Sequence, residues 1–191
     1  VSDSGCCEAM VNAFIHRFGG IDVLINNAGG ALKIPRGEFI DMPVEYWNNQ
    51  IDLNLNAAAY TSRIAVRNMI DNKVRGKIIN VSSIHSIVTW VKRKMLPYSP
   101  GKAGLNMFTK ALACEIAKYG INVNGIAPGF IMTKLSARYS EADMNAFLRK
   151  IPAGRLGTVD DITPMMLFLA DDEKSAFITC LLYTSDAADD K

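Results

Sequence analysis

The sequence predicts an α/β fold in which a parallel sheet lies between two layers of helices. Three short apolar runs, at residues 21–26, 76–83 and 121–128, alternate with longer segments of helical periodicity. Helices of this length between strands indicate βαβ crossovers, which are almost always right-handed and place neighbouring strands parallel. The first run is mostly apolar without alternation, as expected for a strand buried on both faces. The predicted class is therefore a doubly wound parallel sheet.

Capping residues delimit the predicted helices. Asp3 or Ser4 can cap a first helix that ends at Gly19 and Gly20. Thr158 can cap the final helix, because a threonine hydroxyl accepts a hydrogen bond from the first turn. After the first helix, helical periodicity covers four segments, at residues 43–72, 97–119, 140–150 and 158–170, the last of which is the helix that Thr158 can cap.

Composition excludes several classes of function. The formal net charge is +2, so no nucleic-acid partner is predicted. No apolar run approaches the roughly 20 residues of a transmembrane helix, which predicts no membrane segment. The four cysteines fit neither a metal-ligand spacing nor a disulfide framework. We therefore expect a cytoplasmic protein with reduced thiols and no metal site.

Polar and small residues follow each predicted strand, where ligands of open parallel sheets bind. They form the segments 27–29, 82–83 and 128–133. Tyr98 and Lys102 come after the second of these segments and, four residues apart, share one face if they lie on a helix. Together these residues predict a binding or catalytic site at one edge of the sheet.

Pro100 and Gly101 separate Tyr98 from Lys102, although a helix interior tolerates both poorly. If the helix begins at Pro97, Pro100 falls in the first turn, where the backbone N–H groups have no intrahelical partner. Gly101 costs roughly 1 kcal/mol relative to alanine. Close packing or a subunit contact could offset that cost, so a helix remains compatible with both residues.

The order and spacing of the motifs resemble the short-chain dehydrogenase/reductase family over residues 1–179. The motifs are "NNAG" (26–29), "WNNQIDLNLNA" (47–57), "GKIINVSS" (76–83), "YSPGK" (98–102), "INVNGIAPGFIMT" (121–133), "GRLGTVDDI" (154–162) and "FLADDEKSAFIT" (168–179). The resemblance implies a Rossmann-like, three-layer α/β/α domain. It also implies an NAD(P)-dependent oxidoreductase that interconverts a secondary alcohol or sugar hydroxyl with its carbonyl.

The resemblance assigns the catalytic roles to Asn54, Ser83, Tyr98 and Lys102. A carbonyl that accepts hydride needs a proton donor, and Tyr98 would be that donor. A free phenol has a pKa near 10, and the Lys102 ammonium with a positive nicotinamide would favour its ionised form. Ser83 would hydrogen-bond the substrate oxygen, and Asn54 would help to hold a water that relays protons.

Some of these assignments leave alternatives open. The family spacing from Trp47 selects Asn54 among several asparagines, although it could be an ordinary polar helix residue. Ser82 is the lesser candidate for the role of Ser83. His85 and Trp90 fall in the loop between serine and tyrosine, where they resemble sugar-oxidising members, but a loop histidine is often a surface residue.

The resemblance also implies a nicotinamide cofactor, NAD or NADP. Val1 would lie against the adenine, residues 27–29 beside the adenosine ribose, and Ile131 and Thr133 around the carboxamide. The implied cofactor-binding residues are Val1, Asn27, Ala28, Gly29, Tyr98, Lys102, Pro128, Gly129, Ile131 and Thr133, and the implied substrate contacts are Ser83, His85 and Tyr98.

Several family features are missing from the chain. Two strands with their helices, most of a third strand and the glycine-rich pyrophosphate turn would precede Val1. The residue that separates NAD from NADP would lie there too. Residues 180–191, "CLLYTSDAADDK", resemble a translated sequencing adapter where the last strand should begin. We therefore expect residues 1–179 to be part of a longer parent protein, and residues 180–191 to be non-native or else a flexible acidic terminus.

Two other functions remain open at this point. The same scaffold serves 3-oxoacyl-thioester reductases, which act on acyl carrier protein substrates. A protein of another class, a non-catalytic nucleotide-binding protein, could also use this fold, although the complete Asn54, Ser83, Tyr98 and Lys102 set argues against it. The parent is expected to form a homotetramer or homodimer through the two long helices at 43–72 and 97–119, and the isolated chain is expected to be inactive.

Overall fold

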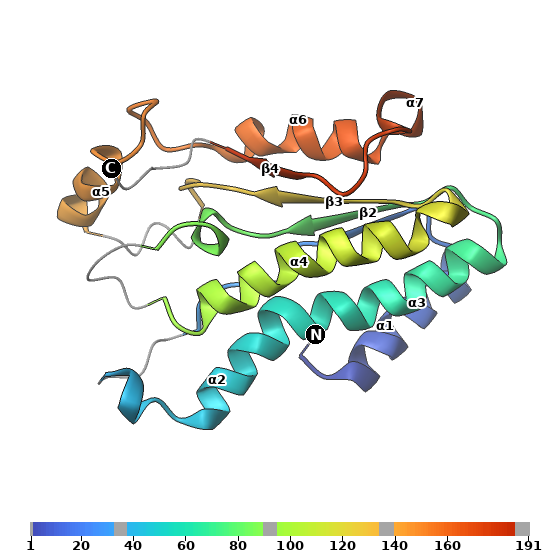
Figure 1. Ribbon diagram of the computed structural model, residues 1–191, viewed down its shortest axis with the longest axis horizontal. Coiled ribbons are helices and arrows are strands. Elements are labelled where there is room, and N and C mark those ends of the chain that lie inside the picture. Colours follow the sequence, from blue (N-terminus) through green and yellow to red (C-terminus); the bar gives the residue numbers. More distant parts are fainter. Residues whose placement is uncertain (1, 33–37, 90–94, 134–139, 186–191) are drawn as a thin grey trace.

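The fold is a parallel sheet with helices on both faces (Figure 1). The computed structural model describes residues 2–32, 38–89, 95–133 and 140–185. The four strands run in the order β1-β2-β3-β4 and all pair in parallel. They are β1 (Val23–Asn26), β2 (Lys77–Val81), β3 (Asn122–Ala127) and β4 (Leu182–Thr184). The predicted α/β class with a doubly wound parallel sheet is confirmed.

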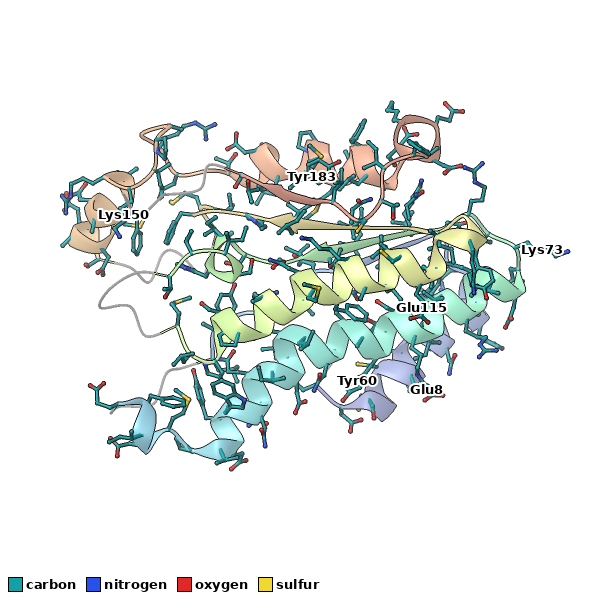
Figure 2. All side chains as sticks on the ribbon, viewed as in Figure 1. Glu8, Tyr60, Lys73, Glu115, Lys150 and Tyr183 are labelled. Carbon is teal, nitrogen blue, oxygen red and sulfur yellow. The ribbon has the colours of Figure 1, made fainter. Side chains whose placement is uncertain are left out.

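Adjacent residues of β2 show which helices cover each face. Ile78 packs in a core with α1 (Ser4–Phe18), α3 (Ala57–Asp71) and α4 (Tyr98–Ile116). Ile79 points the other way and packs against α6 (Val159–Ala170). Tyr183 of β4 lies between its strand and α6 (Figure 2). The other elements are η1 (Phe39–Asp41), α2 (Val44–Ile51), η2 (Asp52–Asn56), η3 (Ile84–Ser86), η4 (Ala117–Tyr119), α5 (Glu141–Leu148) and α7 (Asp172–Ser175).

The predicted helix signals act where expected. Asp3 caps α1 by accepting a hydrogen bond from the Cys6 N–H at 2.7 Å. At the start of α6, the Thr158 N–H donates to the Asp161 carboxylate at 2.7 Å, which completes a capping box. The helix predicted over residues 43–72 forms α2 and α3, but a π-helical turn, η2, joins them.

Two sequence predictions about strands are corrected. Three strands were expected, but residues 182–184 add a fourth by pairing with β3, with Gly125 opposite Leu182. β1 was expected to be buried on both faces, yet Val23 is 38% and Ile25 44% exposed. The reason is that the core under α6 takes residues from β2, β3 and β4 but none from β1.

The last crossover also differs from the prediction. Strand order advances in one direction from β1 to β4, but α6 lies on the face opposite α3 and α4. The connection from β3 to β4 therefore has the opposite hand from the two before it. A right-handed connection is enforced when one helix packs directly back onto the twisted sheet between two strands. The connection from β3 to β4 contains three helices, α5, α6 and α7, so this constraint does not apply to it.

The uncovered face of β1 predicts the behaviour of the isolated chain. Among the described residues β1 pairs only with β2, so its outer backbone and the Val23 and Ile25 side chains are open to association. We expect the 191-residue chain to aggregate and to bind a hydrophobic dye, as measured by light scattering and dye fluorescence. Ile25→Lys should reduce association, whereas Ile40→Lys, at an exposed site away from the sheet, should not. A dye-free monomer would contradict this expectation.

Cys180 predicts a second measurable effect. Its φ of +67° lies in the left-handed region, which costs a residue with a Cβ roughly 1–2 kcal/mol. Cys180→Gly should therefore raise the free energy of unfolding of the 191-residue chain by about 0.5–1 kcal/mol, after the greater flexibility of unfolded glycine is subtracted. Cys180→Ala, which keeps the Cβ, is the control in the same chemical unfolding series. If both variants change the free energy of unfolding by the same amount, the left-handed backbone at residue 180 is not the cause.

Candidate active site

The predicted site residues gather at the carboxyl ends of β1, β2 and β3. Gly29 follows β1, Ser83 follows β2, and the Pro128 carbonyl at the end of β3 accepts a hydrogen bond from the Ile84 N–H at 2.9 Å. Tyr98 is the first residue of α4, and Lys102 lies one turn further. The topology therefore brings together segments that are separated by up to a hundred residues in the sequence.

Gly29 permits the closest approach in the site. A Cβ placed on Gly29 would lie 2.9 Å from Lys102 Nζ and 3.0 Å from Asn54 Oδ1. A Cβ at this position would force the end of the Lys102 side chain to shift, so glycine lets Lys102 and Asn54 come close to the loop after β1. The predicted clustering of residues 29, 54 and 102 is present in the structure.

Asn54 is buried and clamps the loop after β1. Its Nδ2 donates to the carbonyls of Gly30 and Gln50, both at 3.0 Å, and its Oδ1 accepts from the Gly30 N–H at 2.9 Å. It lies in the π-helical turn η2, a local irregularity that often marks functional sites.

Lys102 is almost completely buried, with 3% exposure. Its Nζ donates to the Val81 carbonyl at 2.7 Å. Burial lowers the pKa of Lys102 to about 8, because removal from water penalises the ammonium form. The Lys102 ammonium therefore lies at the centre of the site, and its hydrogen bond to Val81 replaces only part of the hydration that it loses on burial.

The two serines after β2 have different surroundings. Ser82 Oγ donates to the Lys102 carbonyl at 3.1 Å and so ties β2 to α4. Ser83 Oγ accepts a hydrogen bond from the His85 N–H at 3.2 Å as the N-cap of η3. This leaves the O–H proton of Ser83 available for a substrate oxygen, which favours Ser83 over Ser82 as the substrate donor.

The start of α4 agrees with the predicted geometry of Tyr98 and Lys102. Pro100 is the third residue of the helix, within the first turn. Gly101 allows α4 to pack on η2, because a Cβ on it would lie 3.2 Å from the Asn54 Cβ. Its place in the first turn therefore accounts for Pro100, and close helix packing accounts for Gly101.

His85 is buried rather than on the surface. Its ring lies edge-on to Phe130, with centroids 5.9 Å apart, and Phe130 stacks on Phe147 of α5 at 4.4 Å. An aromatic wall therefore joins η3 to α5 beside Ser83. Val1 and Trp90 lie outside the described residues.

The remaining predicted cofactor residues line the same edge of the sheet. Asn27, Ala28 and Gly29 are exposed after β1, and so is Thr133 beyond β3. Ile131 forms a parallel bridge with Gly157, and the Gly129 N–H donates to Ser185 Oγ at 2.8 Å. An exposed loop with no side chain at Gly29, next to the Lys102 cation, fits the close approach of a nucleotide ribose.

A buried polar network beneath the site was not predicted. Asn26 Nδ2 donates to Asn80 Oδ1 at 2.8 Å and to Ser62 Oγ at 3.0 Å, and its Oδ1 accepts from Thr61 at 2.7 Å. Asn80 Nδ2 donates to Thr109 Oγ1 at 2.9 Å. The signal in the sequence was an asparagine in each of two otherwise apolar runs, at positions that pair in the sheet.

The described part of the chain shows neither a metal centre nor a disulfide nor a membrane span. No three His, Cys, Asp or Glu side chains in these ranges lie close enough to hold a metal ion. The four cysteines are free thiols. None of the described helices is long and apolar enough to cross a membrane.

Comparison with known proteins gives the family. A family model described as enoyl-(acyl carrier protein) reductase matches residues 1–187. The fold superposes on a short-chain type dehydrogenase/reductase from Mycobacterium marinum with a TM-score of 0.87 and 28% identity, over 97% of this chain and 71% of that one. The chain belongs to the short-chain dehydrogenase/reductase family.

Two curated relatives of this short-chain dehydrogenase/reductase chain are informative. 3beta-hydroxysteroid dehydrogenase 1 from Eggerthella lenta is 37% identical over 92% of the chain. The 3-oxoacyl-[acyl-carrier-protein] reductase FabG from Buchnera aphidicola is 41% identical over 84% of it. The chain spans 66% and 63% of the lengths of these relatives, respectively.

The buried Lys102 predicts a dependence of stability on pH. Its pKa is about 8 in the fold against 10.5 when exposed, so the unfolded state binds more protons between these values. The free energy of unfolding should therefore rise with pH from about 8 to about 10.5. Lys102→Met should abolish that rise and stabilise the protein at pH 7 by on the order of 2–3 kcal/mol.

Chemical unfolding at pH 7 and pH 10 tests this prediction. Lys110→Met, which removes an exposed lysine from the same helix, serves as the matched control and should keep the rise. If Lys102→Met and the native protein show the same change between the two pH values, burial does not depress the pKa of Lys102.

Proposed function

We propose that the parent protein is an NAD(P)-dependent oxidoreductase that interconverts a secondary alcohol and its carbonyl by hydride transfer. The observation that carries the proposal is the Lys102 ammonium, buried one turn from Tyr98 and beside Gly29 at the carboxyl edge of the sheet. A family membership shared with named dehydrogenases and reductases supports the same reaction class.

The nicotinamide would supply or accept the hydride, and the residues of this chain would manage the proton and the oxygen. In reduction Tyr98 would donate its phenolic proton to the developing alkoxide, and in oxidation it would remove that proton. The Lys102 charge, one turn away, favours the phenolate that this cycle produces. Ser83 would donate its O–H to the same oxygen and hold it close to Tyr98.

Asn54 and Lys102 would also order the cofactor side of the site. Asn54 holds the Gly30 backbone through two hydrogen bonds, so the loop after β1 presents residues 27–29 in one conformation. Lys102 borders this loop at Gly29 and would reach the hydroxyls of the nicotinamide ribose. Asn27, Ala28, Pro128, Gly129, Ile131 and Thr133 remain the proposed further contacts, with NAD and NADP equally open.

Two substrate classes are carried forward. The first class is a secondary alcohol or a sugar hydroxyl, with the corresponding carbonyl. The similarity to a hydroxysteroid dehydrogenase supports an alcohol on a larger skeleton, and the position of His85 beside Ser83 supports a sugar. A 3-oxoacyl thioester is the second candidate, favoured by the 41% identical FabG relative. Assays of the parent with one representative of each class distinguish them.

We further propose a cytoplasmic dimer or tetramer. Met107 on α4 is 64% exposed and Val44 on α2 is 74% exposed, so the two helices expected at the subunit interface carry apolar side chains that a second copy would cover. The burial of Lys102 one turn from Tyr98 lowers the stability of the fold. This loss is accounted for by a catalytic role and is not needed in a non-catalytic nucleotide-binding protein.

Tyr98→Phe in the parent tests the proposal. Removal of the phenolic proton donor should lower kcat by about 10²–10⁴-fold, while nicotinamide binding, followed by fluorescence, stays unchanged. Tyr119→Phe, at a tyrosine that is 46% exposed in η4, the turn that follows α4, is the control and should retain full activity. Undiminished turnover in Tyr98→Phe would show that the mechanism is wrong, and cofactor binding without any native turnover would favour the non-catalytic alternative.

A further inference from the structure

We propose that Asn106 and Ser86 are positioning residues that hold Ser83 at the distance from Tyr98 needed for reaction. This inference rests on the proposed function, because it assigns Ser83 as the substrate hydrogen-bond donor. Neither residue belongs to the motifs from which the catalytic set was predicted. The two link the helix that carries Tyr98 and Lys102 to the turn that carries Ser83.

Asn106 lies on the catalytic face of α4. Tyr98, Lys102 and Asn106 follow one another at intervals of four residues, so their side chains project from the same side of the helix. Asn106 Nδ2 donates a hydrogen bond to Ser86 Oγ at 2.7 Å. Thus the helix face that presents the proton donor also contacts η3 directly.

Ser86 transmits this contact to the backbone of Ser83. Its Oγ donates to the Ser83 carbonyl, and its N–H donates to the same carbonyl at 2.9 Å. At the other end of the turn, the Ile84 N–H is held by the Pro128 carbonyl at 2.9 Å. η3 is therefore fixed between α4 and the end of β3, and Ser83 has its position set from both sides.

Stability alone does not account for asparagine at position 106. Its Oδ1 is buried and has no hydrogen-bond partner among the described residues. An unpaired buried carbonyl oxygen lowers the free energy of unfolding, whereas an apolar side chain of similar size would avoid that loss. The bond from Nδ2 to Ser86 is thus the interaction that the amide contributes, and it leads to Ser83.

The expected effect is on turnover rather than on folding. Without the Ser86 hydroxyl or the Asn106 amide, the Ser83 turn gains freedom relative to Tyr98, and small misplacements of a catalytic group are costly. Ser86→Ala and Asn106→Leu in the parent should each lower kcat by about 10-fold, with KM changed less than about threefold. The two act in series, so the double variant should lose little more than either single variant.

Matched variants separate this role from a structural one. Ser86→Thr keeps the hydroxyl and should restore most of kcat, and Asn106→Leu should leave the thermal midpoint unchanged or raised. The pH dependence of kcat should keep its apparent pKa in all of them, because Tyr98 and Lys102 are not altered. Ser86→Ala with native kcat, Ser86→Thr as impaired as Ser86→Ala, or losses that follow the thermal midpoint would overturn the proposal.

A crystal structure of the parent carrying Ser86→Ala gives a test that does not require turnover. Displacement of the Ser83 backbone from its native position supports the proposal, and an unmoved Ser83 contradicts it. If the native parent shows no turnover but Ser83 moves in the variant, the proposed function fails while the positioning link stands.

Discussion

The burial of one cation, the Lys102 ammonium, is the constraint on which the rest of the site depends. A charge removed from water needs polar atoms around it, and here the Val81 carbonyl accepts from Nζ at 2.7 Å. Glycine at position 29 lets the side chain come close to the loop after β1, and glycine at position 101 lets its helix pack closely on η2. The two glycines and the π turn at Asn54 are thus parts of one packing arrangement.

Polar contacts also set the relation between the strands and helices below the site. Asn26 and Asn80 face each other across β1 and β2 and reach side chains of α3 and α4. In an apolar interior each of these amides must keep its hydrogen-bond partners. The loss of stability from an unpaired buried amide is larger than the net stabilisation from the hydrogen bond. A slip in register of one residue would separate all of them, so the network specifies the alignment of the strand ends that carry Gly29 and Ser83.

The candidate site residues are better shielded from solvent than the face of the sheet at β1. Lys102, Asn54 and Ser83 are all at least nine-tenths buried, whereas Val23 and Ile25 are open to solvent. The geometry of these three residues comes from η2, α4 and the end of β2, which pack against one another. This separation explains how a chain that spans about two thirds of the length of its relatives holds its candidate site residues in buried positions and yet presents an apolar surface.

The sequence by itself determined the helix–strand alternation and the caps at Asp3 and Thr158, and its motifs selected the candidate catalytic residues, because periodicity, capping and motif spacing are local properties of the chain. It did not determine the short β4, the exposure of β1 or the hand of the last crossover, since each depends on which face α6 covers. Nor could it show that Asn54 clamps Gly30, that His85 packs on Phe130, or that Asn106 reaches Ser83 through Ser86. These contacts join residues far apart in the chain, and only the packing of helices against the sheet brings them within hydrogen-bond distance.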